Sequence, residues 1–421
     1  MLRIIGVIIV GVMVSGYFFT FGLSFIPASI NSKMVLAVMG ALLYVFHSIR
    51  NRQVVLPKEL IPATGIVALF SVICFFTADY NGTVDYSYAD YIVSFATWLA
   101  GGYVIVSAIK SLHGRANFKI LTAYLTAVCV FQCAAALIID NNEAVKTLVD
   151  SYILQGQVFL NEIGRLYGIG ASLDPAGVRF SIVMILIAFV VTKEDSVKSN
   201  KTQITLYFLA FFIIGIIGNM ISRTTSTGML LGLGVFLLST GINQLIIRSD
   251  VKKVYAILAL VLIFIALTVN ILYQSSPYFY DLLRFAFEGF FNWMETGVWR
   301  TDSTDKLNAV MWVWPTDIKT WIIGSGLFEN WAFGTDIGYC RFILYCGLIG
   351  FGTFALLFIY SAVILARKFQ KYRLMFLFLI LLSGIIWLKV ATDLFLIYAL
   401  FYWLEREPET IDEPLLQNAH T

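Results

Sequence analysis

The pattern that decides the fold is clearest in residues 180–220, which read FSIVMILIAFVVTKEDSVKSNKTQITLYFLAFFIIGIIGNM. Two apolar runs, which extend over 177–192 and 203–220, flank a short loop that carries three lysines. About 20 such residues in an α-helix are enough to cross a hydrocarbon core that is roughly 30 Å thick. The stretch therefore predicts two membrane-spanning helices joined by a polar turn.

The same pattern recurs along the whole chain. Apolar residues make up 59% of the 421 positions and charged residues only 13%, with a mean hydropathy of +0.83, whereas a soluble domain has roughly 25% charged residues. We therefore predict an all-α integral membrane protein with one polytopic domain, residues 1–405, and a cytoplasmic tail, residues 406–421. The first span is too long for the core of a signal peptide and is expected to stay in the membrane. About twelve transmembrane helices are predicted near residues 4–23, 34–49, 60–77, 91–109, 118–139, 177–192, 203–220, 227–247, 254–273, 338–365, 374–389 and 391–404.

The basic residues predict the orientation of these helices. With the N-terminus inside, 18 of the 29 Lys and Arg residues fall in short cytoplasmic segments, as the positive-inside rule requires. Both termini are then cytoplasmic, and two long loops, residues 140–176 and 274–337, lie outside. The second loop contains aromatic amphipathic stretches at 280–294 and 303–314, which are typical of helices that lie in the membrane interface. Loops of this length in a compact protein are usually functional.

The composition disfavours several classes of function. A net charge of +3 is too small to indicate a nucleic-acid partner. The short cytoplasmic loops hold no Gly-rich phosphate cradle, which argues against an ATP-driven transporter. All three histidines lie on or near the predicted cytoplasmic side, and no His, Cys or carboxylate cluster lies outside. Neither a metal site nor a cofactor is therefore predicted.

Three arginines lie where a charge is costly. An arginine at membrane depth costs about 2.5–3.5 kcal/mol on insertion scales, and by default it indicates function. Arg223 follows Ser222 in a polar break between two spans, where neighbouring hydroxyls favour phosphate binding over simple snorkelling to the headgroups. Arg165 and Arg179 flank a Gly-rich stretch, in which Pro175 suits the first turn of a helix. We expect Arg179 to face a cavity, whereas a functional site and a surface charge are equally compatible with Arg165.

The end of the second long loop contains a candidate acid–base group. Asp336, Tyr339 and Arg341 lie where this loop meets the span at 338–365. A carboxylate beside arginines stays ionised and can accept a proton from an attacking hydroxyl. The alternative role of Asp336 is that of a helix N-cap. Arg300 is a further candidate in this loop.

Four landmarks in this order resemble the bacterial O-antigen polymerase and ligase superfamily, which consists of polytopic glycosyltransferases of the GT-C class. The resemblance covers roughly residues 160–352, and the first five spans match only in hydropathy. The landmarks are Arg165 with Asp174-Pro175, then Ser222-Arg223, then Arg300 with Trp312 and Ile323-Gly-Ser-Gly326, and finally Asp336-Ile-Gly-Tyr339 with Gly347-Leu-Ile-Gly350.

The resemblance implies a substrate class and a location. Members of the superfamily join glycans carried on undecaprenyl diphosphate at the periplasmic face of the bacterial inner membrane, without nucleotide sugars. Arg223 and Arg165 would clamp the diphosphate, and Asp336 would orient or deprotonate the acceptor hydroxyl. The implied partners are the donor and acceptor glycans, membrane lipid, a flippase and a chain-length regulator. The residues implied in binding diphosphate or sugar are Arg179, Arg300, Arg341, Tyr339, Ser222 and Glu329.

One departure distinguishes this chain from part of the superfamily. Ligases, which transfer glycan to the lipid A core, carry a functional His in the second long outer loop, whereas this chain reads Thr335-Asp-Ile-Gly-Tyr339 at that place. The departure favours a polymerase, which adds the growing chain to a new lipid-linked repeat unit. The remaining alternatives are a ligase, a lipid-linked oligosaccharide flippase, which would more often show two related halves, and a non-enzymatic scaffold.

Overall fold

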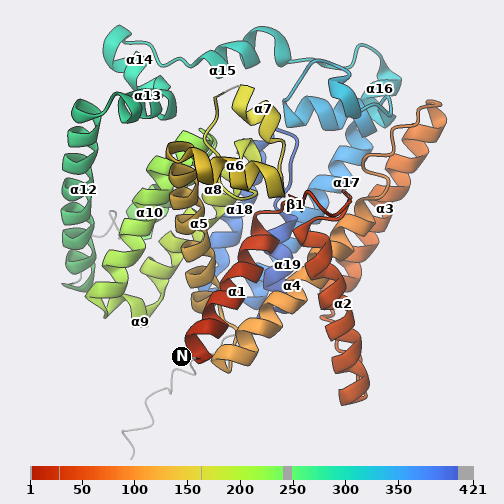
Figure 1. Ribbon diagram of the computed structural model, residues 1–421. Coiled ribbons are helices and arrows are strands. Elements are labelled where there is room, and N and C mark those ends of the chain that lie inside the picture. Colours follow the sequence, from red (N-terminus) through yellow and green to blue (C-terminus); the bar gives the residue numbers. More distant parts are fainter. Residues whose placement is uncertain (1, 28, 163, 240–248, 406–421) are drawn as a thin grey trace, which may run out of the picture.

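The computed structural model describes the whole chain except residues 1, 28, 163, 240–248 and 406–421. The described part is almost entirely helical, and its only sheet is an antiparallel pair formed by β1 (Gly22–Leu23) and β2 (Ile153–Leu154). The helices form a bundle that is covered at one end by short helices (Figure 1). The predicted tail, residues 406–421, lies outside the described residues.

Eight helices in the described part are long and apolar enough to cross a membrane. They confirm an all-α, multi-pass membrane protein, and each of them coincides with a predicted span. These helices are α2 (Ser32–Asn51), α3 (Leu60–Tyr80), α4 (Tyr91–His113), α5 (Phe118–Asn141), α8 (Leu173–Lys193), α10 (Lys201–Ile221), α12 (Ser249–Ser275) and α17 (Gly338–Lys368).

Four shorter apolar helices coincide with the other four predicted spans. They have between 9 and 17 residues, fewer than a straight crossing of the hydrocarbon core needs. The span predicted at 227–247 also continues into residues that the structure does not describe. The number of twelve spans and their orientation therefore stay predictions. The four helices are α1 (Leu2–Phe18), α11 (Thr225–Ser239), α18 (Arg373–Ile386), which follows the 3-10 helix η3 (Gln370–Tyr372), and α19 (Phe395–Trp403).

Both predicted long loops lie at one end of the bundle, which we call the loop end (Figure 1). The first loop holds α6 (Glu143–Tyr152), β2 and α7 (Gln157–Glu162), whereas α9 (Asp195–Lys198) lies at the opposite end. The second loop forms a chain of short helices, and these include the stretches predicted to be amphipathic. Its elements are α13 (Pro277–Ala286), α14 (Glu288–Thr296), α15 (Asp302–Lys306), the π-helix η1 (Leu307–Met311), α16 (Ile318–Ile323) and the 3-10 helix η2 (Glu329–Trp331).

Side-chain caps set where the helices of the second loop begin. The Ser276 hydroxyl accepts a hydrogen bond from the Phe279 amide, and Pro277 occupies the first turn of α13. The Asp317 carboxylate likewise accepts from the Thr320 amide (2.9 Å) at the start of α16. These bonds satisfy amides that have no partner within the first helical turn. Short helices can therefore form here although no long apolar run supports them.

Close packing around α8 places the turn between α10 and α11. α8 is the most deeply buried of the eight long helices, with 83% of its apolar window inside the protein, against 6% for α12. A Cβ atom on Gly228 would lie 2.1 Å from the Cα of Ser181, and one on Gly177 would lie 2.6 Å from the Ser222 hydroxyl. Glycine at both positions lets the backbones approach this closely. The turn at 222–224 therefore lies directly beside the first turn of α8.

The Ile323-Gly-Ser-Gly326 segment is attached to a kink in α17. At Gly347 the backbone leaves helical geometry, with φ at +65° and ψ at −176°. The Tyr345 carbonyl, which lies at this kink, accepts a hydrogen bond from the Gly326 amide (3.0 Å). A Cβ atom on Gly324 would lie 2.1 Å from the same carbonyl oxygen, so this contact requires glycine. The second long loop is thereby anchored to α17 near its end.

Candidate functional site

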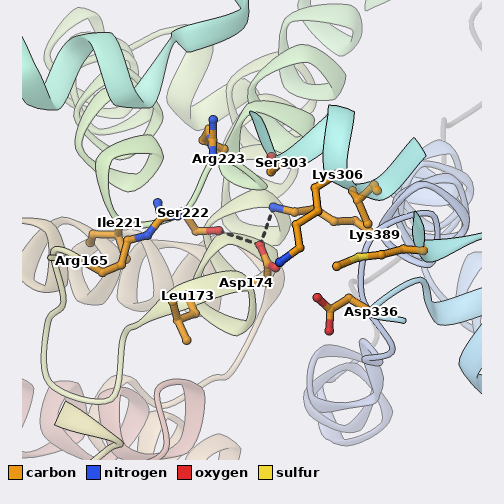
Figure 2. Close-up of a pocket in the computed structure, with 12 residues that line it drawn as sticks. Arg165, Leu173, Asp174, Ile221, Ser222, Arg223, Ser303, Lys306, Asp336 and Lys389 are labelled. Carbon is orange, nitrogen blue, oxygen red and sulfur yellow. Dashed lines mark hydrogen bonds and ion pairs between the residues drawn. The ribbon is translucent and has the colours of Figure 1, made fainter. Parts of the chain in front are cut away.

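A cavity of about 210 Å³ lies at the loop end of the bundle, and we call it the arginine cavity (Figure 2). Four residues that the sequence predicts as site residues, Arg165, Ser222, Arg223 and Asp336, line it together. They come from three separate stretches of the chain. The complete lining is Arg165, Leu173, Asp174, Ile221, Ser222, Arg223, Ser303, Lys306, Leu307, Met311, Asp336 and Lys389.

Two arginines of this cavity contact the same aromatic ring. The guanidinium carbons of Arg165 and Arg223 lie 4.1 Å and 4.6 Å from the ring centroid of Phe285, which belongs to α13. Burial lowers the pKa of both guanidinium groups, and the charge of Arg165 lowers the pKa of Arg223 further. Like charges held together in a partly desolvated site repel each other. A bound anion would relieve this repulsion.

The two arginines differ in their carboxylate partners. Arg223 forms an ion pair with Glu288 of α14, and the two side chains are only 16% and 19% exposed. Within the described part of the chain, Arg165 has no ion-pair partner. Arg223 therefore already binds a carboxylate at the position where an anionic ligand would bind, whereas Arg165 is available to a ligand.

A half-buried hydrogen-bond network lies in the wall of the cavity. The Asp174 carboxylate accepts hydrogen bonds from the ammonium group of Lys389 (2.8 Å) and from the Ser222 hydroxyl (3.1 Å) (Figure 2). It also accepts one from the Thr224 hydroxyl (2.5 Å). It joins the first turn of α8, the turn before α11 and the segment after α18. As the sequence predicts, Pro175 lies in the first turn of α8. Ser222 and Thr224 flank Arg223 in the chain, so their hydrogen bonds to Asp174 fix the position of the Arg223 backbone.

Sequence reasoning missed Lys389 and Asp174 as site residues. One signal could have identified Lys389. It lies in a short turn between two apolar spans on the predicted outer side, where the positive-inside rule disfavours a basic residue. Its partner Asp174 is 215 positions away, and no local pattern connects the two.

Asp336 lies in front of α17 and does not belong to it. The helix begins at Gly338, with Ile337 at the N-cap position, so the alternative role of Asp336 as an N-cap is wrong, and it shares no face of that helix with Tyr339. The Asp336 carboxylate accepts a hydrogen bond from the indole nitrogen of Trp331 (3.1 Å), and the residue is exposed. Figure 2 shows it on the side of the cavity away from Arg165. The carboxylate is thus accessible to a ligand that the arginines bind.

The charges of the arginine cavity favour an anionic ligand. Four cationic side chains line it against two carboxylates; Lys389 is paired with Asp174 and Arg223 with Glu288, which leaves Arg165 and Lys306 without an ion-pair partner in the described part of the chain. Guanidinium groups bind phosphate through two parallel hydrogen bonds, so a phosphate or diphosphate fits the excess positive charge.

No protein-family model, curated protein or solved structure matches the chain. The resemblance to the O-antigen polymerase and ligase superfamily therefore stays a prediction.

Arg179 does not line the arginine cavity. It lies in α8, half-buried, and its guanidinium carbon is 5.9 Å from the ring centroid of Phe19. Its Nε atom is buried without a hydrogen-bond partner in the described part of the chain. Arg179 therefore packs partly against protein, and the arginine cavity is lined by other residues.

Three other predicted binding residues lie at the end of the second loop, away from the cavity lining. Arg341 donates a hydrogen bond to the Phe328 carbonyl oxygen (2.7 Å) and stacks on the ring of the same residue. The Tyr339 hydroxyl donates to the Gly384 carbonyl oxygen (3.0 Å), which connects α17 with α18. Glu329 is exposed in η2. The contacts of Arg341 and Tyr339 hold the fold of this region together.

Arg300 also lies outside the cavity lining. It is exposed and forms an ion pair with Asp305 (2.8 Å). The described residues contain no group of three or more His, Cys, Asp or Glu side chains that could hold a metal ion. Of the nine predicted site residues, the structure thus brings four together.

We expect Glu288→Gln to increase the affinity of the arginine cavity for anions. The substitution removes the carboxylate that competes for Arg223, while the amide oxygen can still accept the hydrogen bond from the Asp302 amide (2.9 Å). A hydrogen bond to a charged group contributes about 1.5–3 kcal/mol, so the gain should be about tenfold or more. It can be measured as the dissociation constant of undecaprenyl diphosphate in detergent, by phosphorus NMR. Glu295→Gln, which removes the exposed partner of Arg284, is the matched control, and equal affinities in both variants would contradict the prediction.

Proposed function

We propose that the chain is a polymerase of lipid-linked glycans. It joins undecaprenyl-diphosphate-linked repeat units into O-antigen or a related surface polysaccharide at the periplasmic face of a bacterial inner membrane. The observation that carries this proposal is the convergence of Arg165, Arg223 and Asp336 on one cavity. A scaffold protein would have no need for partly desolvated arginines opposite an exposed carboxylate. A charged cavity of this kind suits a reaction in which a phosphate is the leaving group.

The proposed reaction needs an anion site and a proton acceptor. The hydroxyl oxygen of the acceptor sugar forms a bond to the anomeric carbon of the donor glycan, while the bond from that carbon to the diphosphate oxygen breaks. The diphosphate leaves with the electron pair, and Arg165, Arg223 and Lys306 neutralise its charge. Preorganised cations of this kind supply a large part of catalysis in sites that exclude water. The proton of the acceptor hydroxyl passes to Asp336, which acts as the general base.

The membrane location supports a lipid-linked substrate. Eight helices are long and apolar enough to cross a bilayer, and the arginine cavity lies at one end of that bundle. A polyprenyl tail can remain in the lipid while the diphosphate reaches the arginines. The proposed partners are accordingly the lipid-linked donor and acceptor, membrane lipid, a flippase that supplies the repeat unit and a chain-length regulator.

Reconstitution tests this function directly. The purified chain is placed in proteoliposomes with an undecaprenyl-diphosphate-linked repeat unit, and the products are separated by size. A ladder of chains that differ by one repeat unit is the expected result. Movement of the substrate across the bilayer without growth would instead indicate a flippase, and transfer only to added lipid A core would indicate a ligase. Either of these two results would overturn the proposal.

A further inference from the structure

A second cavity of about 490 Å³ adjoins the arginine cavity, and we call it the tryptophan cavity. The two cavities share Arg223, Ser303, Leu307 and Lys389 in their linings. The volume of the tryptophan cavity lies within the roughly 300–1,000 Å³ that is typical of small-molecule sites. A ligand bound by Arg223 in one cavity can therefore continue into the other without leaving the protein.

The lining of the tryptophan cavity contains aromatic residues, whereas that of the arginine cavity contains none. Trp299 and Trp312 are 67% and 41% exposed although they lie in a lining, so their rings are available to a ligand. The indole ring of Trp299 packs against Gly289, where an added Cβ atom would lie 2.8 Å from it. Glycine at this position therefore leaves the space that the ring occupies. Rigid, amphipathic aromatic surfaces bind ligands at a low entropic cost.

The same lining also contains hydroxyl and amide groups. Thr301 and Thr304, whose hydroxyls are hydrogen-bonded to each other (2.9 Å), line the cavity together with Asn308, whose side chain forms no hydrogen bond within the described residues. Glu288 adds a carboxylate, which can accept hydrogen bonds from hydroxyl groups. A lining that combines aromatic rings with short polar groups matches a pyranose ring, which has an apolar C–H face and hydroxyls at its edge.

We propose that the tryptophan cavity binds the sugars of the donor glycan that lie next to its diphosphate. The inference rests on the proposed function, and it adds a glycan subsite with Trp312 and Trp299 as its stacking platforms. The order of the two cavities then follows the order of the substrate. The diphosphate contacts Arg223 in the shared wall, and the first sugars extend from it over the indole rings.

Binding of a glycan that has no lipid and no diphosphate tests this subsite. The probe is the water-soluble oligosaccharide that mild acid releases from undecaprenyl-diphosphate-linked glycan, and saturation-transfer NMR on the purified protein is the measurement. We expect Trp312→Ala to weaken oligosaccharide binding at least tenfold and Trp312→Phe to restore most of it. Affinity for undecaprenyl diphosphate should stay within about twofold of that of the unmodified protein. Trp293→Ala is the matched control, because Trp293 is exposed on α14 but lines neither cavity.

The possible outcomes separate this inference from the proposed function. Equal oligosaccharide affinity in Trp312→Ala and in the unmodified protein would overturn the subsite, even if chain growth persists. Loss of oligosaccharide binding in Trp293→Ala to the same degree would also overturn it, because the tryptophans would then act through membrane anchoring. Glycan binding that depends on Trp312 in a protein that does not extend chains would support the subsite and contradict the polymerase.

Discussion

Replacing Arg223 with alanine is expected to lower the rate of chain growth at least a hundredfold in proteoliposomes, while the protein remains inserted. Arg223 lies in the shared wall of both cavities and contacts Phe285 beside Arg165. Removal of one preorganised donor to a developing charge costs about 10²–10³ in rate in other enzymes. Arg223→Lys should retain part of the activity, because it keeps the charge but loses the planar fork that binds a phosphate through two hydrogen bonds.

Two further variants make this prediction sharper. Arg223→Ala leaves Glu288 without its partner, and an unpaired carboxylate would itself repel a diphosphate. The double variant Arg223→Ala with Glu288→Gln removes this repulsion, and we expect it to remain at least tenfold below the unmodified protein. Arg284→Ala, which removes a half-buried arginine of α13 that lines neither cavity, should grow chains at the normal rate. Full activity in Arg223→Ala would contradict the proposed site.

Replacing Gly324 with alanine is expected to have the largest effect on stability. Gly324 has a φ of +84° and a ψ of −178°, a conformation that is essentially restricted to glycine. An added Cβ atom would also lie 2.1 Å from the Tyr345 carbonyl oxygen at the kink of α17. Strain and steric overlap together should cost about 3 kcal/mol or more. The midpoint of thermal unfolding in detergent, followed by intrinsic fluorescence, should fall accordingly.

Two matched glycines separate the causes of this effect. Gly334 also has a positive φ, but an added Cβ atom there would meet nothing within 4 Å, so Gly334→Ala should show the strain alone. Gly11 lies within α1 with a free position for a Cβ atom, and Gly11→Ala should leave the midpoint unchanged or raise it slightly. If Gly324→Ala unfolds at the same temperature as Gly11→Ala, the anchoring of the second loop at this point is wrong.

The helices were predictable because each long apolar run imposes a helix on its own residues. The bounds of α3, α5 and α10 follow from hydropathy, since a membrane leaves the backbone no other partner for its hydrogen bonds. The short helices α18 and α19 were placed correctly along the chain, but hydropathy could not show that they are shorter than a crossing. That difference depends on the turn between them, where Lys389 reaches Asp174.

The site residues were predictable only where the charge of a single side chain beside an apolar span carries a free-energy cost of its own. Arg223 and Arg165 attract attention because a charge beside apolar spans needs a reason. Arg341 was predicted beside Asp336 where the second loop meets a span, yet it binds the carbonyl oxygen of Phe328 and stacks on its ring. Sequence shows the cost of the charge but not the group that compensates it. Only the packing of the loop separates an arginine that binds a ligand from one that holds the chain.

The kink at Gly347 also bears on the depth at which Asp336 lies. α17 has 31 residues, and a straight helix of that length would be about 46 Å long, which exceeds the roughly 30 Å of a hydrocarbon core. The piece after the kink, residues 348–368, would be about 32 Å long. Helices relieve such hydrophobic mismatch by tilting or by bending, and a bilayer centred on residues 348–368 would place the piece before Gly347 near the level of the lipid headgroups. Under the proposed function, the kink would thus bring Asp336, just before this piece, to the level at which the diphosphate of a polyprenyl lipid lies.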